Sequence, residues 1–139
     1  MSGVYKRNKK ETSFEPVDNA AKLQDEITKY IMNENRVPKR WRPIAFKAAE
    51  KAGEIADLAI AANETWPDEK HIEKRREYWR DCIRACKQLD RKLTSLQNCI
   101  PSVTAGSLNE ILRMLDKEIN AATYRKNNER VITGGYKKK

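Results

Sequence analysis

The sequence is poor in the residues from which catalytic sites are built. Histidine occurs once, at His71, before a charged run, so no nucleophile–base pair is available. No glycine-rich phosphate loop or dinucleotide fingerprint is present. Two of the three cysteines, Cys82 and Cys86, fall on the apolar side of an expected helix, and Cys99 and His71 lie turns away along it. We therefore expect core cysteines, no catalytic residue, no metal, no cofactor and no enzymatic activity.

Long apolar runs are also missing. No stretch approaches the 18 residues of a membrane-spanning helix, and the polar N-terminus lacks the apolar core of a signal peptide, so we expect no membrane partner. An odd number of cysteines argues against a disulfide framework, and a reducing cytoplasm is the simplest location. The length of 139 residues predicts one domain.

What is abundant is charge and alanine. Charged residues make up 35% of the chain and the net charge is +9, which makes nucleic acid the first partner to consider. Hydrophobic residues make up only 39%, and the five glycines and five prolines fall mostly at the edges of periodic segments. This profile favours helices with narrow apolar faces over a sheet sandwich.

Apolar periodicity predicts four helices, over about 17–34, 38–64 and 68–99, and from a start between 104 and 107 to about 124. Gly53 weakens the case for an unbroken second helix, and Pro43 allows that helix to begin later than Pro38. Ser107 and Glu110 have the spacing of a capping box for the fourth. The predicted fold is an all-α antiparallel four-helix bundle at 17–124, between flexible basic segments at 1–16 and 125–139.

The second and third helices have clear apolar faces. In the second, an alanine-rich set recurs at steps of three and four residues, which lets a neighbouring helix approach closely. Its members are Trp41, Ala45, Ala48, Ala52, Ile55, Ala59 and Ala62. The corresponding set of the third helix is Trp79, Cys82, Cys86, Leu89, Leu93, Leu96 and Ile100.

Opposite the apolar face of the third helix lies a strip of cations without an acid inside it. It spans an arc of about 80° and a length of about 22 Å at helical spacing, dimensions suited to a phosphate backbone. Its members, here called the cationic ridge, are Arg76, Arg80, Arg84, Lys87 and Arg91. The alternative is a solvated helix face, in which Glu73, Glu77, Asp81 and Asp90 pair with these cations at i, i+3 spacing.

A second basic group opens the second helix. Lys39, Arg40 and Arg42 are candidate phosphate contacts, and Trp41 between them is either a base-stacking residue or a cap on the core. Its register with the alanine-rich set favours the cap. The segment 36–51 carries six cations against Glu50 alone, a net charge of +5.

The chain resembles the accessory variability determinant (Avd) family, which serves the reverse transcriptases of diversity-generating retroelements. The resemblance spans roughly residues 18–130. It rests on the order and spacing of Val37-Pro-Lys-Arg-Trp-Arg42, Ala62-Asn63, the arginine-rich third helix with its leucines, Ile111-Leu-Arg-Met-Leu-Asp116 and Tyr124-Arg-Lys126. A group of four-helix proteins encoded in intervening sequences of ribosomal RNA is also similar.

This resemblance implies a four-helix bundle that assembles into a homopentameric barrel and binds its reverse transcriptase and nucleic acid, as template RNA or cDNA, through basic surfaces. The alternatives are a protein-interaction scaffold and a ribosomal-RNA-associated four-helix protein without a reverse-transcriptase partner. For subunit contacts, Ile72 and Ile83 are the expected apolar candidates.

Overall fold

Within residues 2–132, the regular structure consists of four α-helices and one short 3-10 helix. The computed structural model describes the backbone of residues 2–132 and the side chains of residues 15–132. Its elements are α1 (Ser2–Met32), η1 (Lys39–Trp41), α2 (Arg42–Glu64), α3 (Ile72–Cys99) and α4 (Asn109–Asn128). No strand occurs among the described residues, so the all-α class is confirmed.

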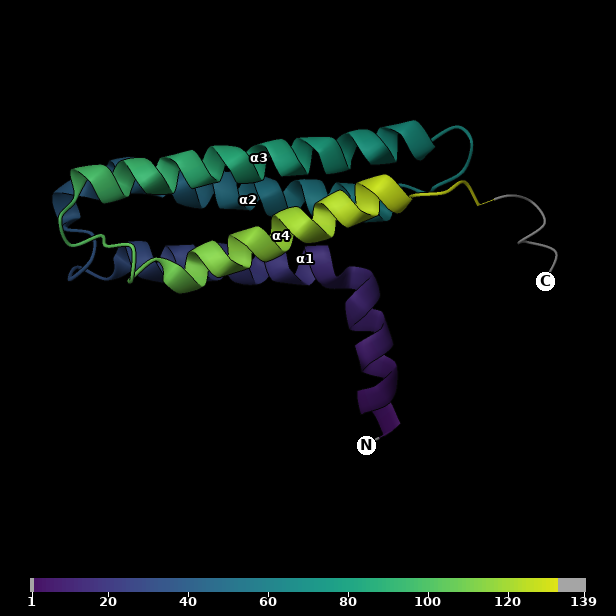
Figure 1. Ribbon diagram of the computed structural model, residues 1–139, viewed down its shortest axis with the longest axis horizontal. Coiled ribbons are helices and arrows are strands. Elements are labelled where there is room, and N and C mark those ends of the chain that lie inside the picture. The colour runs from purple at the N-terminus through teal and green to yellow at the C-terminus, as the bar shows by residue number, and fades with distance from the viewer. Residues whose placement is uncertain (1, 133–139) are drawn as a thin grey trace.

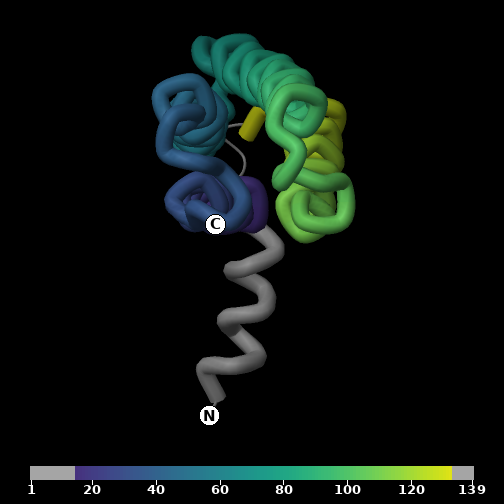
Figure 2. The backbone as a smooth tube through the Cα atoms, turned by 90° about the vertical axis from the view of Figure 1, so that its left-hand side faces the viewer, coloured from purple at the N-terminus to yellow at the C-terminus, as the bar shows by residue number. Residues whose placement is uncertain are grey.

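Successive helices run in opposite directions and lie side by side (Figure 1). α2 packs against α1 and α3, and α4 packs against α3 and α1, so each helix has two main neighbours. A view along the long axis shows the four helices around a common centre (Figure 2). Their arrangement agrees with the predicted antiparallel four-helix bundle with short connections.

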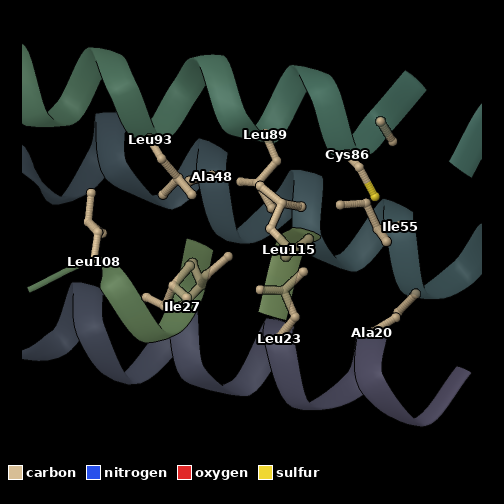
Figure 3. Close-up of a cluster of buried hydrophobic side chains, with 14 of the residues drawn as sticks. Ala20, Leu23, Ile27, Ala48, Ile55, Cys86, Leu89, Leu93, Leu108 and Leu115 are labelled. Atoms are coloured by element: carbon tan, nitrogen blue, oxygen red, sulfur yellow. The ribbon is translucent and has the colours of Figure 1, made fainter. Parts of the chain in front are cut away.

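The helix faces that periodicity predicted to be apolar form the core. From Ala45 to Ala62, every member of the α2 set is buried, and so is the whole α3 set. Side chains from all four helices meet there, among them Leu23, Ile55, Leu89 and Leu115 (Figure 3). Trp41 is partly buried against this core, as expected of a cap.

Gly53 does not interrupt α2, which is continuous from Arg42 to Glu64. A Cβ atom built at this position would lie 3.0 Å from Nε2 of Gln24 on α1. That distance is shorter than ordinary van der Waals contact, but the atom is the end of a flexible side chain that can move aside.

The helix starts differ from those predicted, and each has a local cause. α2 begins at Arg42 because Pro38 precedes a 3-10 turn, and Pro43 then takes a first-turn position. The Ser107–Glu110 capping box is wrong. Thr104 and Ser107 instead exchange backbone-to-side-chain hydrogen bonds of 3.1 Å, one turn ahead of α4. α4 itself has no side-chain cap.

The ends of the bundle also differ from the predicted domain limits. α1 is assigned from Ser2, far ahead of residue 17, although the side chains of residues 1–14 lie outside the described part. α4 continues to Asn128 instead of ending near 124, and the Glu129 side chain is 9% exposed. The predicted flexible segment therefore cannot begin at 125, because residues 125–129 are held to the bundle. Residues 133–139, with their three lysines, lie outside the described residues.

A buried carboxyl group in the core was not predicted. Glu118 of α4 is fully buried and accepts a 3.0 Å hydrogen bond from Nδ2 of Asn19 on α1. The same amide donates to the carbonyl of Met114 at 3.0 Å. Desolvation by burial raises the pKa of Glu118 to about 8, so the carboxyl group is mainly protonated at neutral pH.

This proton gives the fold a specific pH dependence. Between the ordinary pKa of 4.5 and the folded value of about 8, the folded state holds a proton that the unfolded state has released. Stability therefore falls as pH rises through this window, by about 3 kcal/mol between pH 5 and pH 7. In Glu118→Gln this contribution is absent, so the loss of unfolding free energy between pH 5 and pH 7 should be smaller than in wild type by that amount. Urea unfolding at several pH values measures it.

The control is Glu110→Gln, which removes an exposed carboxylate from the same helix. Its unfolding free energy should follow the wild-type pH dependence. Parallel pH curves for wild type and Glu118→Gln would show that the Glu118 proton is not taken up on folding.

Candidate nucleic-acid interface

The cationic ridge lies on the outer face of α3. Because Trp79, Cys82 and Cys86 point into the core, the ridge side chains are directed to solvent. Four of the five are exposed, and Arg76 is intermediate. The predicted separation of an apolar face from a cationic face on this helix is therefore present.

Carboxylates neutralise the N-terminal half of the ridge. Glu73 lies 3.3 Å from Arg76 and 3.4 Å from Arg80, and Asp81 lies 2.9 Å from Arg84. This half agrees with the alternative of a solvated, ion-paired helix face. Each such exposed pair contributes well under 1 kcal/mol to stability, but together they reduce the positive potential available to a polyanion.

The C-terminal half of the ridge is different. Lys87 and Arg91 are both exposed, and neither makes an ion pair with any described side chain. The Lys87–Asp90 pair that spacing allowed does not form. Glu77 likewise does not pair with Arg80, and lies instead 3.6 Å from Lys74. The unneutralised charge of α3 is therefore concentrated toward its C-terminal end.

α2 adds cations beside this unneutralised half. Nζ of Lys51 donates to Oε1 of Gln88 at 2.8 Å, which shows which turns of the two antiparallel helices lie beside each other. One turn from this contact lie Lys47 on α2 and Arg91 with Lys92 on α3. Neither Lys47 nor Lys92 has a carboxylate partner within residues 15–132. We give the name basic α2–α3 face to these cations together with Lys87, which lies on the outer side of α3 away from α2; its members are Lys47, Lys87, Arg91 and Lys92.

Reasoning on single helices missed Lys47 and Lys92, because neither lies on the arc of the ridge. The sequence signal that pointed to Lys47 was the +5 segment at 36–51. Lys92 has no signal of its own, since it joins the surface only through the packing of α3 against α2.

The second predicted basic group is mostly engaged. Glu34 lies 3.9 Å from Lys39 and 3.6 Å from Arg42. Arg42 also donates to the carbonyl of Met32 at 3.2 Å, and its side chain is only 19% exposed. It therefore ties the end of α1 to the start of α2. Arg40 is exposed and forms no ion pair among the described side chains.

A third group of cations surrounds Glu129, just beyond α4, and was not predicted. Nε of Arg75 lies 2.7 Å from Oε2 of Glu129, and both side chains are nearly buried, at 8% and 9% exposed. Nε1 of Trp79 donates to the same oxygen at 2.9 Å. Nε of Arg125 lies 3.8 Å from it. This group joins the end of α4 to the first two turns of α3.

The sulfur and imidazole groups do not form a metal site. Cys82 and Cys86 are buried in the core, and their mutual hydrogen bond, with burial, raises the pKa of the Cys82 thiol. His71 is near Asp68 at 2.7 Å, outside the core. Within the described residues, no three histidine, cysteine or acidic side chains are placed to hold a metal ion.

The exposed and buried ion pairs should differ sharply in their effect on stability. Arg75→Ala leaves the Glu129 carboxylate nearly buried without its closest cation, and should lower the unfolding free energy by about 3 kcal/mol. Arg84→Ala removes one member of an exposed pair and should change it by less than about 0.5 kcal/mol. Urea unfolding of the two variants measures both. Equal losses would mean that the Arg75–Glu129 contact is not structural.

None of the described helices is long and apolar enough to cross a membrane. Comparison of the chain with protein-family models, with curated proteins and with solved structures finds no match.

Proposed function

We propose that the protein is a non-catalytic nucleic-acid-binding protein, accessory to the reverse transcriptase of a diversity-generating retroelement. The observation that carries the binding role is the basic α2–α3 face. Its four cations, Lys47, Lys87, Arg91 and Lys92, lie on adjoining turns of two helices without a carboxylate partner among the described residues. Surface cations without carboxylate partners attract phosphate groups.

Binding through this face would be electrostatic and largely independent of base sequence. Phosphate contacts by lysine and arginine release counterions, so the affinity depends steeply on salt. Such contacts position a nucleic acid without reading its bases. Template RNA and its cDNA are therefore both suitable ligands.

The reverse-transcriptase partner rests on the resemblance to the Avd family. The motifs behind that resemblance occupy the described bundle, with Val37–Arg42 at the start of α2 and Ile111–Asp116 on α4. We further propose that the protein acts in the cytoplasm, where its cysteines would remain reduced.

We also propose that the protein is a homopentamer. Ile72 and Ile83, the expected subunit contacts, do not fit that role, because Ile72 is buried and Ile83 is partly buried against the core. Other large apolar side chains are exposed instead, namely Met32, Ile44, Phe46, Ile60, Trp66 and Tyr124. An assembly that covers some of these and repeats the basic face by symmetry would bind polyanions more tightly than one bundle.

The ion-paired half of the cationic ridge favours a second candidate, a protein-interaction scaffold without nucleic-acid ligand. Arg76, Arg80 and Arg84 all have carboxylate neighbours, which is typical of a solvated helix face. Titration with nucleic acid separates the two functions, since a scaffold would show little binding at physiological salt.

The double variant Lys87→Ala/Arg91→Ala should weaken binding of single-stranded RNA or DNA about tenfold at 100 mM salt, because two phosphate contacts are lost. The slope of log affinity against log salt should become shallower by about 1.4, at about 0.7 per contact for single strands. Fluorescence anisotropy with a labelled 30-nucleotide strand measures both quantities.

The matched control is Arg113→Ala/Lys117→Ala, which removes the same charge from α4. Both of its cations have carboxylate neighbours, Glu110 and Glu15. The control should bind nearly as well as wild type. If both double variants lose affinity equally, the effect is one of net charge and the basic α2–α3 face is not the site.

Assembly is tested by light scattering coupled to size-exclusion chromatography. Five copies of the 16.1 kDa chain have a mass of about 80 kDa. Ile60→Asp and Phe46→Asp should reduce this mass if these side chains are at the subunit contact, while far-ultraviolet circular dichroism stays helical. A wild-type mass of a single chain would rule out the pentamer.

A further inference from the structure

Glu129 occupies a site that has more positive charge than one carboxylate requires. The guanidinium groups of Arg75 and Arg125 lie 2.7 and 3.8 Å from Oε2 of Glu129. Arg76 donates to the backbone carbonyl of the same residue at 3.1 Å. The indole N–H of Trp79 donates to the carboxylate at 2.9 Å, as the third group beside Oε2. We call Arg75, Arg76, Trp79 and Arg125 the arginine cluster.

Parts of the cluster have contacts with the bundle that do not involve Glu129. Nη1 of Arg75 donates to the carbonyl of Thr65 at 2.7 Å, and a longer contact of 3.4 Å reaches the carbonyl of Asn63. Trp79 is fully buried in the core. The Arg125 guanidinium lies over the Trp79 ring, 5.7 Å from its centroid. These supports orient cations and an N–H donor toward one point before any anion is bound.

The carboxylate is an incomplete partner for these groups. Nε of Arg75 lies 2.7 Å from Oε2 of Glu129, but its N–H is not well aimed at that oxygen. Burial lowers the pKa of Arg125. The negative charge of Glu129 raises this pKa, and the positive charge of Arg75 lowers it. Cations therefore repel one another across a single negative charge. A phosphate group, with more acceptor oxygens than a carboxylate, would satisfy more of these donors.

The residues that bring Glu129 to this position form a short extended segment, residues 129–132. It begins where α4 ends, and Glu129 itself has extended backbone angles. Its far end is fixed by a 2.8 Å hydrogen bond from the amide of Ile132 to the carbonyl of Pro67. Apart from the contacts of Glu129 itself, this is the backbone hydrogen bond that ties the segment to the bundle, so displacing the carboxylate would leave the segment attached mainly at Ile132.

We propose that the arginine cluster is a phosphate-binding site for nucleic acid, and that Glu129 occupies it as a substitute for phosphate when no ligand is bound. A nucleic-acid phosphate displaces the carboxylate and releases residues 129–132. The cluster then extends the binding surface along α3, since Arg76 is both a member of it and the first cation of the ridge. The inference rests on the proposed nucleic-acid-binding function. It adds a second site, occupied by Glu129 of the same chain, that lowers the affinity for nucleic acid until the carboxylate is displaced.

The test compares Glu129→Gln with Glu110→Gln, which removes one carboxylate from an exposed pair with Arg113. Both variants gain the same net charge. Glu129→Gln should bind a single-stranded 30-mer about tenfold more tightly than wild type at 100 mM salt, and its salt slope should be steeper by about 1. Glu110→Gln should differ from wild type by less than about twofold. Arg75→Lys in the Glu129→Gln background should remove most of the gain.

Amide hydrogen exchange on the wild-type protein gives a second readout that needs no variant. Saturation with the 30-mer should lower the protection of the Ile132 amide, while protection in α2 and α4 stays unchanged. Loss of protection at Ile132 supports displacement of the segment.

The two proposals fail in distinguishable ways. If the Lys87→Ala/Arg91→Ala variant loses affinity, but Glu129→Gln matches Glu110→Gln and Ile132 stays protected, the self-occupied site is overturned and nucleic-acid binding stands. If Glu129→Gln binds and wild type does not, Glu129 blocks the site completely, which supports the inference. Absence of binding by every variant overturns both.

Discussion

The close packing of α2 on its two neighbours is the constraint on which the rest of the structure depends. Six alanines of α2 are buried, and α2 packs against both α1 and α3. Small side chains let helix backbones come near one another but bury little apolar area each. The larger core side chains therefore come mainly from the other helices, notably Leu23, Trp79, Leu89 and Leu115. This packing also sets the register that places Lys47 beside the C-terminal half of α3.

Features that depend on local periodicity could be predicted from the sequence. The apolar faces of α2 and α3 and the outward cationic face all follow from residue spacing. Features that depend on tertiary contact could not. In the sequence, Glu118 looks like any other charged residue of an amphipathic helix. Its burial follows only from the packing of α4 against α1, where Asn19 donates a hydrogen bond to it. The Ser107 cap was wrong because Thr104 offered a competing partner one turn earlier.

The candidate site shows the same division. The ridge was predictable as a set of cations, but its neutralisation was not, because i, i+3 spacing allows several pairings and rotamers select among them. Glu73 contacts both Arg76 and Arg80, which leaves Glu77 to Lys74. Helical periodicity could not predict the arginine cluster, because Arg75 and Glu129 are far apart in sequence and Glu129 follows the last helix.

The protonated carboxyl group of Glu118 has a consequence for the energetics of folding. At neutral pH the unfolded chain carries this group as a carboxylate, while the folded chain carries it as an acid hydrogen-bonded within the core. Folding therefore takes up a proton from the buffer, and the heat of buffer ionisation becomes part of the calorimetric enthalpy. Two buffers at one pH, such as phosphate and Tris, would report different unfolding enthalpies for the same structural transition.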